Sequence, residues 1–272
     1  MTALSTEHIP APSGTAGFGV TAKAIAVRTA RKILRSPQIL GIAIVQSIVF
    51  LLMFRYILGG AIGITGVDYV DFLVPGFVIS GMLFTAGGSA VAVAEEAAGG
   101  LYDRLRSLPV SDWAVLAGRG IADAFLLVVV ALVTTGVGFL VGFRMDTSPG
   151  DVALALVLLC VYALVVACVF VWLGLVAGNA QAAQGLSILG VPFSFISSAF
   201  VPIATMPGWI QWFAEAQPLT FWINSWRGLL LGDPVVQSFE HDLSYYIVGG
   251  LLWAVVLLAV FSPLALRAYR KR

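Results

Sequence analysis

The sequence has little charge. Of its 272 residues, only 11% are charged and 60% are hydrophobic, whereas a soluble globular chain carries about a quarter charged residues. A chain of this composition cannot cover itself with polar surface. Apolar runs longer than the roughly 18 residues needed to cross a bilayer also recur along it. The sequence therefore predicts a membrane protein with several spans, whose solvent is lipid.

Side chains that build catalytic and metal sites are also scarce. The only cysteines, Cys160 and Cys168, would lie about 12 Å apart along one helix, too far for a disulfide. The histidines, His8 and His241, have too few neighbouring ligands for a zinc or copper site. No GxxxxGK[ST] loop for ATP occurs. We expect no enzyme, cofactor or metal in this chain, and its net charge of +1 argues against nucleic-acid binding.

Six apolar segments predict six transmembrane helices, at about 38–58, 72–94, 121–143, 152–177, 184–204 and 243–265. Pro192 and Pro202 should bend the fifth. Basic residues stay in the cytoplasm, and with both termini there only Arg55, Arg144 and Arg227 of the 15 lie outside. The predicted fold is an all-α polytopic membrane protein with both termini cytoplasmic. Sparse lysine, three against twelve arginines, indicates a bacterial source and hence the inner (plasma) membrane.

Three domains are expected: a tail and interface helix over 1–37, the transmembrane domain over 38–265, and a basic tail over 266–272. Within the first, residues 18–36 form a basic amphipathic helix when drawn at 100° per residue. Its apolar half includes Phe18, Ala22 and Ile25. Such a helix suits an anionic membrane surface; the alternative is a helix packed on the protein itself.

The predicted spans contain mild polar groups and almost no charge. Hydroxyls and amides along a mostly apolar path suit an amphiphilic or lipophilic cargo, although helix packing explains each of them as well. The candidate path residues are Gln46, Ser80, Thr85, Ser89, Ser194, Ser197 and Ser198. Arg55 and Asp123 lie near span ends, where anchoring at the membrane boundary is favoured over ion coupling. The pairs Gly138/Gly142 and Gly174/Gly178 predict close helix contacts.

A long connection over about 203–232 is rich in tryptophan, which prefers the headgroup region. It predicts a re-entrant or interfacial helix pair on the outer face, broken at Pro218, that forms part of an exit gate. Ordinary membrane anchoring is the alternative. The candidate gate residues are Pro207, Trp209, Trp212, Pro218, Trp222 and Arg227.

Two motifs carry a family resemblance. The segment after the second span has the form E-x-x-x-G-x-x-x-R-L-R-S-x-P, met by Glu96, Gly100, Arg104, Leu105, Arg106, Ser107 and Pro109. The outer connection has the form MP-x-W … P-L … R-x-L-L-x-G, met by Met206, Pro207, Trp209, Pro218, Leu219, Arg227, Leu229, Leu230 and Gly232. With six spans in register, the chain resembles the permease subunit of a type-2 ABC exporter, and is most similar to the daunorubicin/doxorubicin-resistance branch.

The resemblance implies a separate ABC ATPase that holds ATP and Mg²⁺, in a core of two ATPase copies and two permease chains. Residues 95–112 would be the coupling helix that docks on that ATPase, and the alternative is a solvated loop. The candidate coupling residues are Glu95, Glu96, Gly99, Gly100, Asp103, Arg104, Leu105, Arg106 and Pro109. The implied function is ATP-driven export of a hydrophobic drug or natural product; related branches export polysaccharides, lipid-linked glycans or lipids. A membrane enzyme or passive channel would need a charged or metal-binding cluster within the spans.

Overall fold

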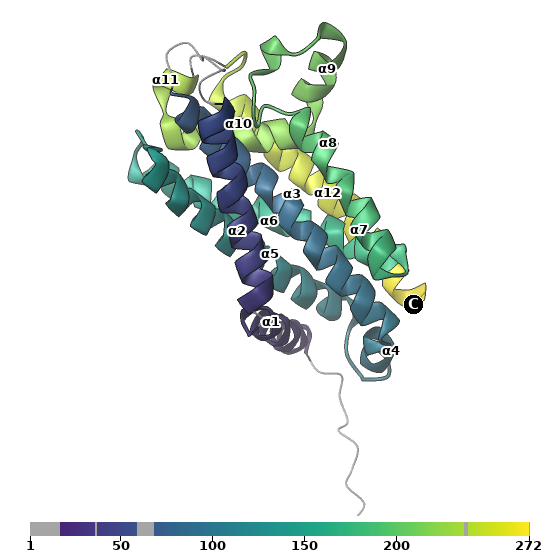
Figure 1. Ribbon diagram of the computed structural model, residues 1–272. Coiled ribbons are helices and arrows are strands. Elements are labelled where there is room, and N and C mark those ends of the chain that lie inside the picture. The colour runs from purple at the N-terminus through teal and green to yellow at the C-terminus, as the bar shows by residue number, and fades with distance from the viewer. Residues whose placement is uncertain (1–16, 36, 59–67, 237–238, 272) are drawn as a thin grey trace, which may run out of the picture.

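The computed structural model describes residues 17–35, 37–58, 68–236 and 239–271, and every regular element in these ranges is helical. The expected N-terminal tail lies outside them except for Gly17, as does Arg272. Figure 1 shows a bundle of long helices with shorter helices at both ends.

Within the described ranges, four helices are long and apolar enough to cross a membrane. They are α3 (Tyr69–Ala98), α5 (Asp112–Val141), α6 (Pro149–Ala177) and α12 (Leu243–Lys271). Helices of 29 or 30 residues are about 45 Å long, more than the roughly 30 Å hydrocarbon core. α3, α6 and α12 contain the predicted second, fourth and sixth segments, and α5 covers the third as far as Val141.

The first and fifth predicted segments are less regular. The first is α2 (Pro37–Met53), which continues into a π-helical turn, η1 (Phe54–Leu58). The fifth is broken where a single bent helix was predicted: α7 (Ala180–Ile188) is followed by α8 (Gly190–Phe195), and the α-helix ends at Phe195, short of the predicted end at residue 204. Pro192 explains the break, because it lacks the N–H that would bond to the carbonyl of Ile188, the last residue of α7.

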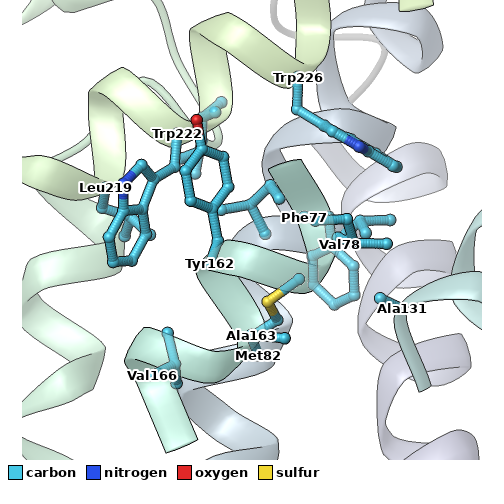
Figure 2. Packing of buried hydrophobic residues seen from close by; sticks show 14 of the residues in the cluster. Phe77, Val78, Met82, Ala131, Tyr162, Ala163, Val166, Leu219, Trp222 and Trp226 are labelled. Carbon is cyan, nitrogen blue, oxygen red and sulfur yellow. The ribbon is translucent and has the colours of Figure 1, made fainter. Parts of the chain in front are cut away.

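The core lies between α3, α6 and α10 (Pro218–Leu231), and Figure 2 shows the side chains that meet there. Tyr162 of α6 stacks on Trp222 of α10, with ring centroids 4.9 Å apart. The indole N–H of Trp226 donates to the carbonyl of Ala155 at 3.0 Å. Buried aromatic rings whose polar tips find partners hold α10 firmly against the long helices.

The two glycine pairs divide between packing and helix ends. A Cβ at Gly174 would lie 2.4 Å from the carbonyl oxygen of Ala90, and one at Gly138 would lie 2.8 Å from Val74, so both permit close contacts with α3 as predicted. Gly142 and Gly178 instead end α5 and α6 with φ of 115° and 82°. The spacing prediction is therefore right for one member of each pair, since left-handed C-caps also favour glycine.

The α4 end of the bundle carries α1 (Phe18–Leu34), α4 (Leu101–Arg106) and the end of α12 (Figure 1). The helix predicted over 18–36 is thus present. It packs on α5: a Cβ at Gly118 would lie 2.5 Å from the carbonyl oxygen of Ala22 and 2.9 Å from Ile25. The apolar side of α1 thus contacts the protein, as in the alternative interpretation. Phe18 and Val20 remain exposed, and their contact with lipid stays a prediction.

The opposite, α9 end carries η2 (Ile203–Thr205), α9 (Gly208–Ala216), α10 and α11 (Asp233–Val236) (Figure 1). The tryptophan-rich connection is therefore a helix pair, and it breaks between Ala216 and Pro218 as predicted. Proline is tolerated as the first residue of α10 because the N–H that it lacks would be unpaired there.

Candidate functional site

A cavity of about 600 Å³ lies between α1, α2, α3, α5, α7 and α8. We call it the charged cavity, after five of its lining residues: Lys32, Glu95, Glu96, Arg119 and Asp123. Uncharged polar groups along it include Gln46, Thr85, Ser89, Gln184 and Ser187. The other walls are mainly apolar, with Ile42, Leu83, Phe84, Leu126, Ile188 and Val191 among them. The lining can therefore contact both polar and apolar parts of a ligand.

Four of these charged residues, Lys32, Glu96, Arg119 and Asp123, form one network across three helices. Glu96 of α3 accepts from Lys32 Nζ of α1 at 2.8 Å and pairs with Arg119 of α5. Arg119 Nε in turn donates to Asp123 Oδ2 at 2.9 Å, one helical turn further along α5. Arg119 and Asp123 are both buried. Buried charges of this kind need paired partners to be tolerated, and the network supplies them from α1, α3 and α5.

The sequence favoured an anchor at the membrane boundary for Asp123. The structure instead buries Asp123 and Arg119 together within the bundle, and the Asp123 side chain is only 1% exposed. The signal that could have found them is their spacing of four residues inside an apolar run, which places opposite charges on one helix face.

Three of the seven predicted path residues, Gln46, Thr85 and Ser89, line the charged cavity. Ser80 and Ser194 are fully buried between helices, and their hydroxyls have no hydrogen-bond partner. Ser197 is also fully buried and donates to the carbonyl of Ser194 at 2.6 Å. Gln184 and Ser187 also line the cavity but were not predicted as path residues, because nothing in the sequence distinguishes them from the other polar residues of the fifth segment.

The chain turns sharply where α3 leads into α4. Gly99 caps α3, and Gly100 has φ of 71°, a conformation that glycine adopts at little cost, so both predicted glycines lie at the turn. Glu95 and Glu96 belong to the last turn of α3. The predicted coupling segment thus comprises a helix end, a glycine turn, a short helix, a connection over 107–111 and the first residue of α5.

Contacts with α12 and α5 hold α4 in place. Tyr102 is buried and packs edge-to-face on Tyr269, with ring centroids 5.5 Å apart; burial raises the pKa of Tyr102 well above its usual range. Arg106 pairs with Asp103 and donates to the carbonyl of Arg270 at 2.9 Å. Arg270 also binds Asp112 at 2.8 Å. Asp103 and Arg104 of α4 are exposed, as is Pro109 after it, and Leu105 is half-buried.

The predicted gate residues divide between two helices. On α9, Trp209 and Trp212 are 75% and 67% exposed, and Pro207 just before it is exposed as well. On α10, Trp222 is buried and Pro218 is half-buried. The α9 rings are therefore free to meet lipid or solvent, whereas the α10 rings belong to the core.

Arg227 of α10 is only 1% exposed and joins three parts of the fold. Its guanidinium donates to the carbonyls of Ser198 at 2.7 Å and Phe72 at 3.1 Å, and to Asn224 Oδ1 at 3.0 Å. It also lies 3.7 Å from the centroid of the Phe72 ring. Uncharged oxygens and a π face thus replace the carboxylate that usually pairs with a buried arginine.

A second cavity, of about 340 Å³, lies at the α9 end beside Arg227. We call it the aromatic cavity, after five of its lining residues: Phe72, Trp212, Phe239, Tyr245 and Tyr246. Ser198, the remaining predicted path residue, also lines it. The path residues therefore do not form one continuous lining but belong to two cavities and to buried packing. Within the described residues, no group of three or more His, Cys, Asp or Glu side chains is placed to hold a metal ion.

Comparison with known proteins shows to which family the chain belongs. The family model of ABC-2 type transporters matches residues 21–231. The chain is 32% identical over 230 residues to the daunorubicin resistance ABC transporter permease protein DrrB1 of Streptomyces coeruleorubidus, covering 84% of this chain and 78% of that protein. It is 27% identical over 235 residues to the probable doxorubicin resistance ABC transporter permease protein DrrC of Mycobacterium tuberculosis, with coverage of 84% and 80%.

A more distant match is the probable multidrug ABC transporter permease YbhR of Escherichia coli, 25% identical over 213 residues, with coverage of 75% and 53%. The chain belongs to the ABC-2 type transporter family. It is a multi-pass membrane protein and the permease subunit, not the ATPase subunit, and it is related to drug-resistance and multidrug exporters. Membership in this family implies a partner ATPase.

Proposed function

We propose that this chain is the permease of an ATP-driven exporter that moves a hydrophobic drug or natural product out of a bacterial cell. A separate ATPase subunit would bind ATP and Mg²⁺ and power the transport. Two permease chains, identical or different, would assemble with two ATPase copies in the plasma membrane. The names of the relatives support the cargo class, and the charged cavity, with its apolar walls and polar groups, supports an amphiphilic cargo.

The proposed topology has six spans, formed by α2 with η1, α3, α5, α6, α7 with α8, and α12. The α4 end would be cytoplasmic and the α9 end would face outward. Figure 1 supports this sidedness, because α1, α4 and the end of α12 share one end of the bundle, and these segments carry most of the basic residues. The helix pair α9 and α10 would then lie in the outer leaflet and form part of the exit gate.

One observation carries the mechanism: Glu95 and Glu96 line the charged cavity and lie in the last turn of α3, directly before the glycine turn into α4. A displacement of α4 by the ATPase would therefore reach the cavity within a few residues. The contacts of α4 with α12 and α5 would transmit that displacement to these two helices as well. A flexible loop would absorb the same movement, so we assign coupling to the turn and to α4 with its exposed Arg104.

Reconstitution tests the proposal. The chain and the ATPase that co-purifies with it would be placed in proteoliposomes, and hydrophobic compounds screened for stimulated ATP hydrolysis and for vectorial transport. An ATPase variant without its P-loop lysine is the control, since it should abolish both signals. Transport of a lipid-linked glycan or a lipid, with no response to hydrophobic drugs, would contradict the proposed cargo. Transport that continues with the inactive ATPase would contradict ATP-driven export.

A further inference from the structure

We propose that the end of α1 binds an anionic phospholipid of the cytoplasmic leaflet. The inference goes beyond the proposed export function and rests only on the proposed sidedness of the bundle. Arg31 and Lys32 belong to the last turn of α1, and Arg35 continues that turn, since its N–H donates to the carbonyl of Arg31 at 3.0 Å. Residues three and four apart lie side by side on a helix. We call these three exposed residues the basic cluster.

Two charges of the basic cluster are uncompensated. Lys32 binds Glu96 at 2.8 Å, whereas Arg31 and Arg35 have no ion pair within the described residues. A guanidinium group prefers carboxylate or phosphate oxygens, which it can bind with two N–H donors at once. The cluster therefore favours a ligand with negatively charged oxygens and repels a cation.

The position of the basic cluster indicates the headgroup of a lipid instead of a free anion. The first proposed span, α2, begins at Pro37, two residues after Arg35, and Figure 1 shows α1 at the lower end of α2. The cluster would therefore lie where the chain enters the membrane. Ala22 and Ile25 of α1 pack against α5, and the exposed cluster takes no part in that contact. Anionic lipids of the cytoplasmic leaflet present their phosphates at this level and attract nearby Lys and Arg side chains.

Lys32 connects the basic cluster to the charged cavity, because it also lines that cavity. Its side chain is 57% exposed, and that of its partner Glu96 is 12% exposed. An ion pair with one partner so exposed contributes little net stability, so a lipid phosphate can compete for Lys32. Glu96 would keep its pair with Arg119. Bound anionic lipid would thus loosen the contact between α1 and the end of α3 that leads into α4.

Native mass spectrometry of the purified full-length chain tests the site, with dioleoylphosphatidylglycerol and dioleoylphosphatidylcholine as probes. The two lipids share their acyl chains and differ in net charge. Each basic residue near an anionic surface strengthens binding about fivefold. We therefore expect the first phosphatidylglycerol to bind at least about tenfold more tightly than phosphatidylcholine. Arg31→Gln combined with Arg35→Gln should remove most of this preference. Lys23→Gln combined with Arg267→Gln, which removes two exposed charges elsewhere at the α4 end, should keep it.

A second measurement follows the competition for Lys32. A carbodiimide joins an amine and a carboxylate that are in contact, so it should crosslink Lys32 to Glu96, and peptide mapping would measure the yield. Added phosphatidylglycerol should lower this yield, whereas phosphatidylcholine should not. A yield that does not respond to phosphatidylglycerol would exclude the competition.

Equal affinity of the wild type for the two lipids would overturn the inference, and so would a full preference in the variant that lacks Arg31 and Arg35. The wild-type comparison decides even if that variant fails to fold. If the basic cluster docks on the ATPase instead, that variant would lose co-purification with the ATPase, and the wild-type chain alone would show no lipid preference. Both measurements use the chain alone, so absence of ATP-driven export would contradict the proposed function and leave this inference standing.

Discussion

Replacing Arg227 with methionine should destabilise the α9 end of the bundle. The guanidinium connects α10 to the first turn of α3 through the Phe72 carbonyl and to the turn after α8 through the Ser198 carbonyl. It also fixes the Asn224 side chain, which accepts from the Ser198 hydroxyl at 2.9 Å. Methionine fills a similar volume but supplies no donor.

The magnitude follows from the two backbone carbonyls, of Phe72 and Ser198, that lose a donor, because Asn224 Oδ1 keeps its hydrogen bond from the Ser198 hydroxyl. A buried acceptor left unpaired costs about 1–3 kcal/mol, which makes the gross loss about 2–6 kcal/mol. Two effects offset part of it, since methionine removes the free-energy cost of burying a charge and adds apolar packing. We expect a net destabilisation of about 1–4 kcal/mol. Arg227→Lys should be destabilised by an intermediate amount, because lysine keeps the positive charge but lacks the planar guanidinium, with its several N–H donors and its contact with the Phe72 ring.

The assay is thermal unfolding of the purified chain in detergent, after fractionation has confirmed insertion into the membrane. Arg28→Met is the matched control. Because Arg28 is exposed on α1, this variant should unfold at the same temperature as the wild type. If Arg227→Met also melts with the wild type, the three hydrogen bonds contribute no net stability, and Arg227 must have been retained for another reason, such as contact with a ligand in the aromatic cavity.

Three further experiments have definite expected outcomes. Arg104→Glu should weaken assembly with the ATPase and abolish transport while membrane insertion stays intact, because Arg104 is exposed on α4. Normal co-purification and transport would remove α4 from the coupling path. Gly174→Val should reduce the yield of folded protein, since a Cβ there would lie 2.4 Å from a backbone oxygen of α3. Gly120→Ala, where a Cβ would have nothing within 4 Å, is the control, and equal yields of the two variants would contradict the packing. In single-tryptophan variants, lipid-borne quenchers should reduce the fluorescence of Trp209 and Trp212 more than aqueous iodide does, and the opposite order would place α9 in water.

The long helices could be predicted from sequence because each contains an apolar run that needs no partner to be recognised. The helix pair at 208–231 could be predicted for a similar reason, since proline and tryptophan carry local signals. The division of the fifth segment at Leu189 could not be placed, because Pro192 allows either a bend or a break and the neighbouring packing decides between them.

The candidate site was only partly predictable. Composition singles out Gln46, Thr85 and Ser89 as polar groups in apolar runs, but seven such residues looked alike, and only tertiary structure divides them between two cavities and buried packing. The burial of Arg119 was not predicted. Its spacing of four residues from Asp123 is a local signal, but its other partner, Glu96, is 23 residues away on another helix, and no local pattern reveals that pairing.

Arg119 and Arg227 are both buried, but they are held in different ways. Arg227 is held by backbone carbonyls and one amide, and carbonyls cannot change partners without moving the backbone. Arg119 donates to one backbone carbonyl, that of Ser89, at 3.4 Å, but its shorter bonds go to side-chain carboxylates from two helices, and one of these, Glu96, is shared with Lys32 on a third helix. Ion pairs of this kind can exchange partners through side-chain rotation alone. A rigid α9 end and a rearrangeable α4 end are what the proposed mechanism needs, because the ATPase would act on α4 while the helix pair at the other end keeps its shape.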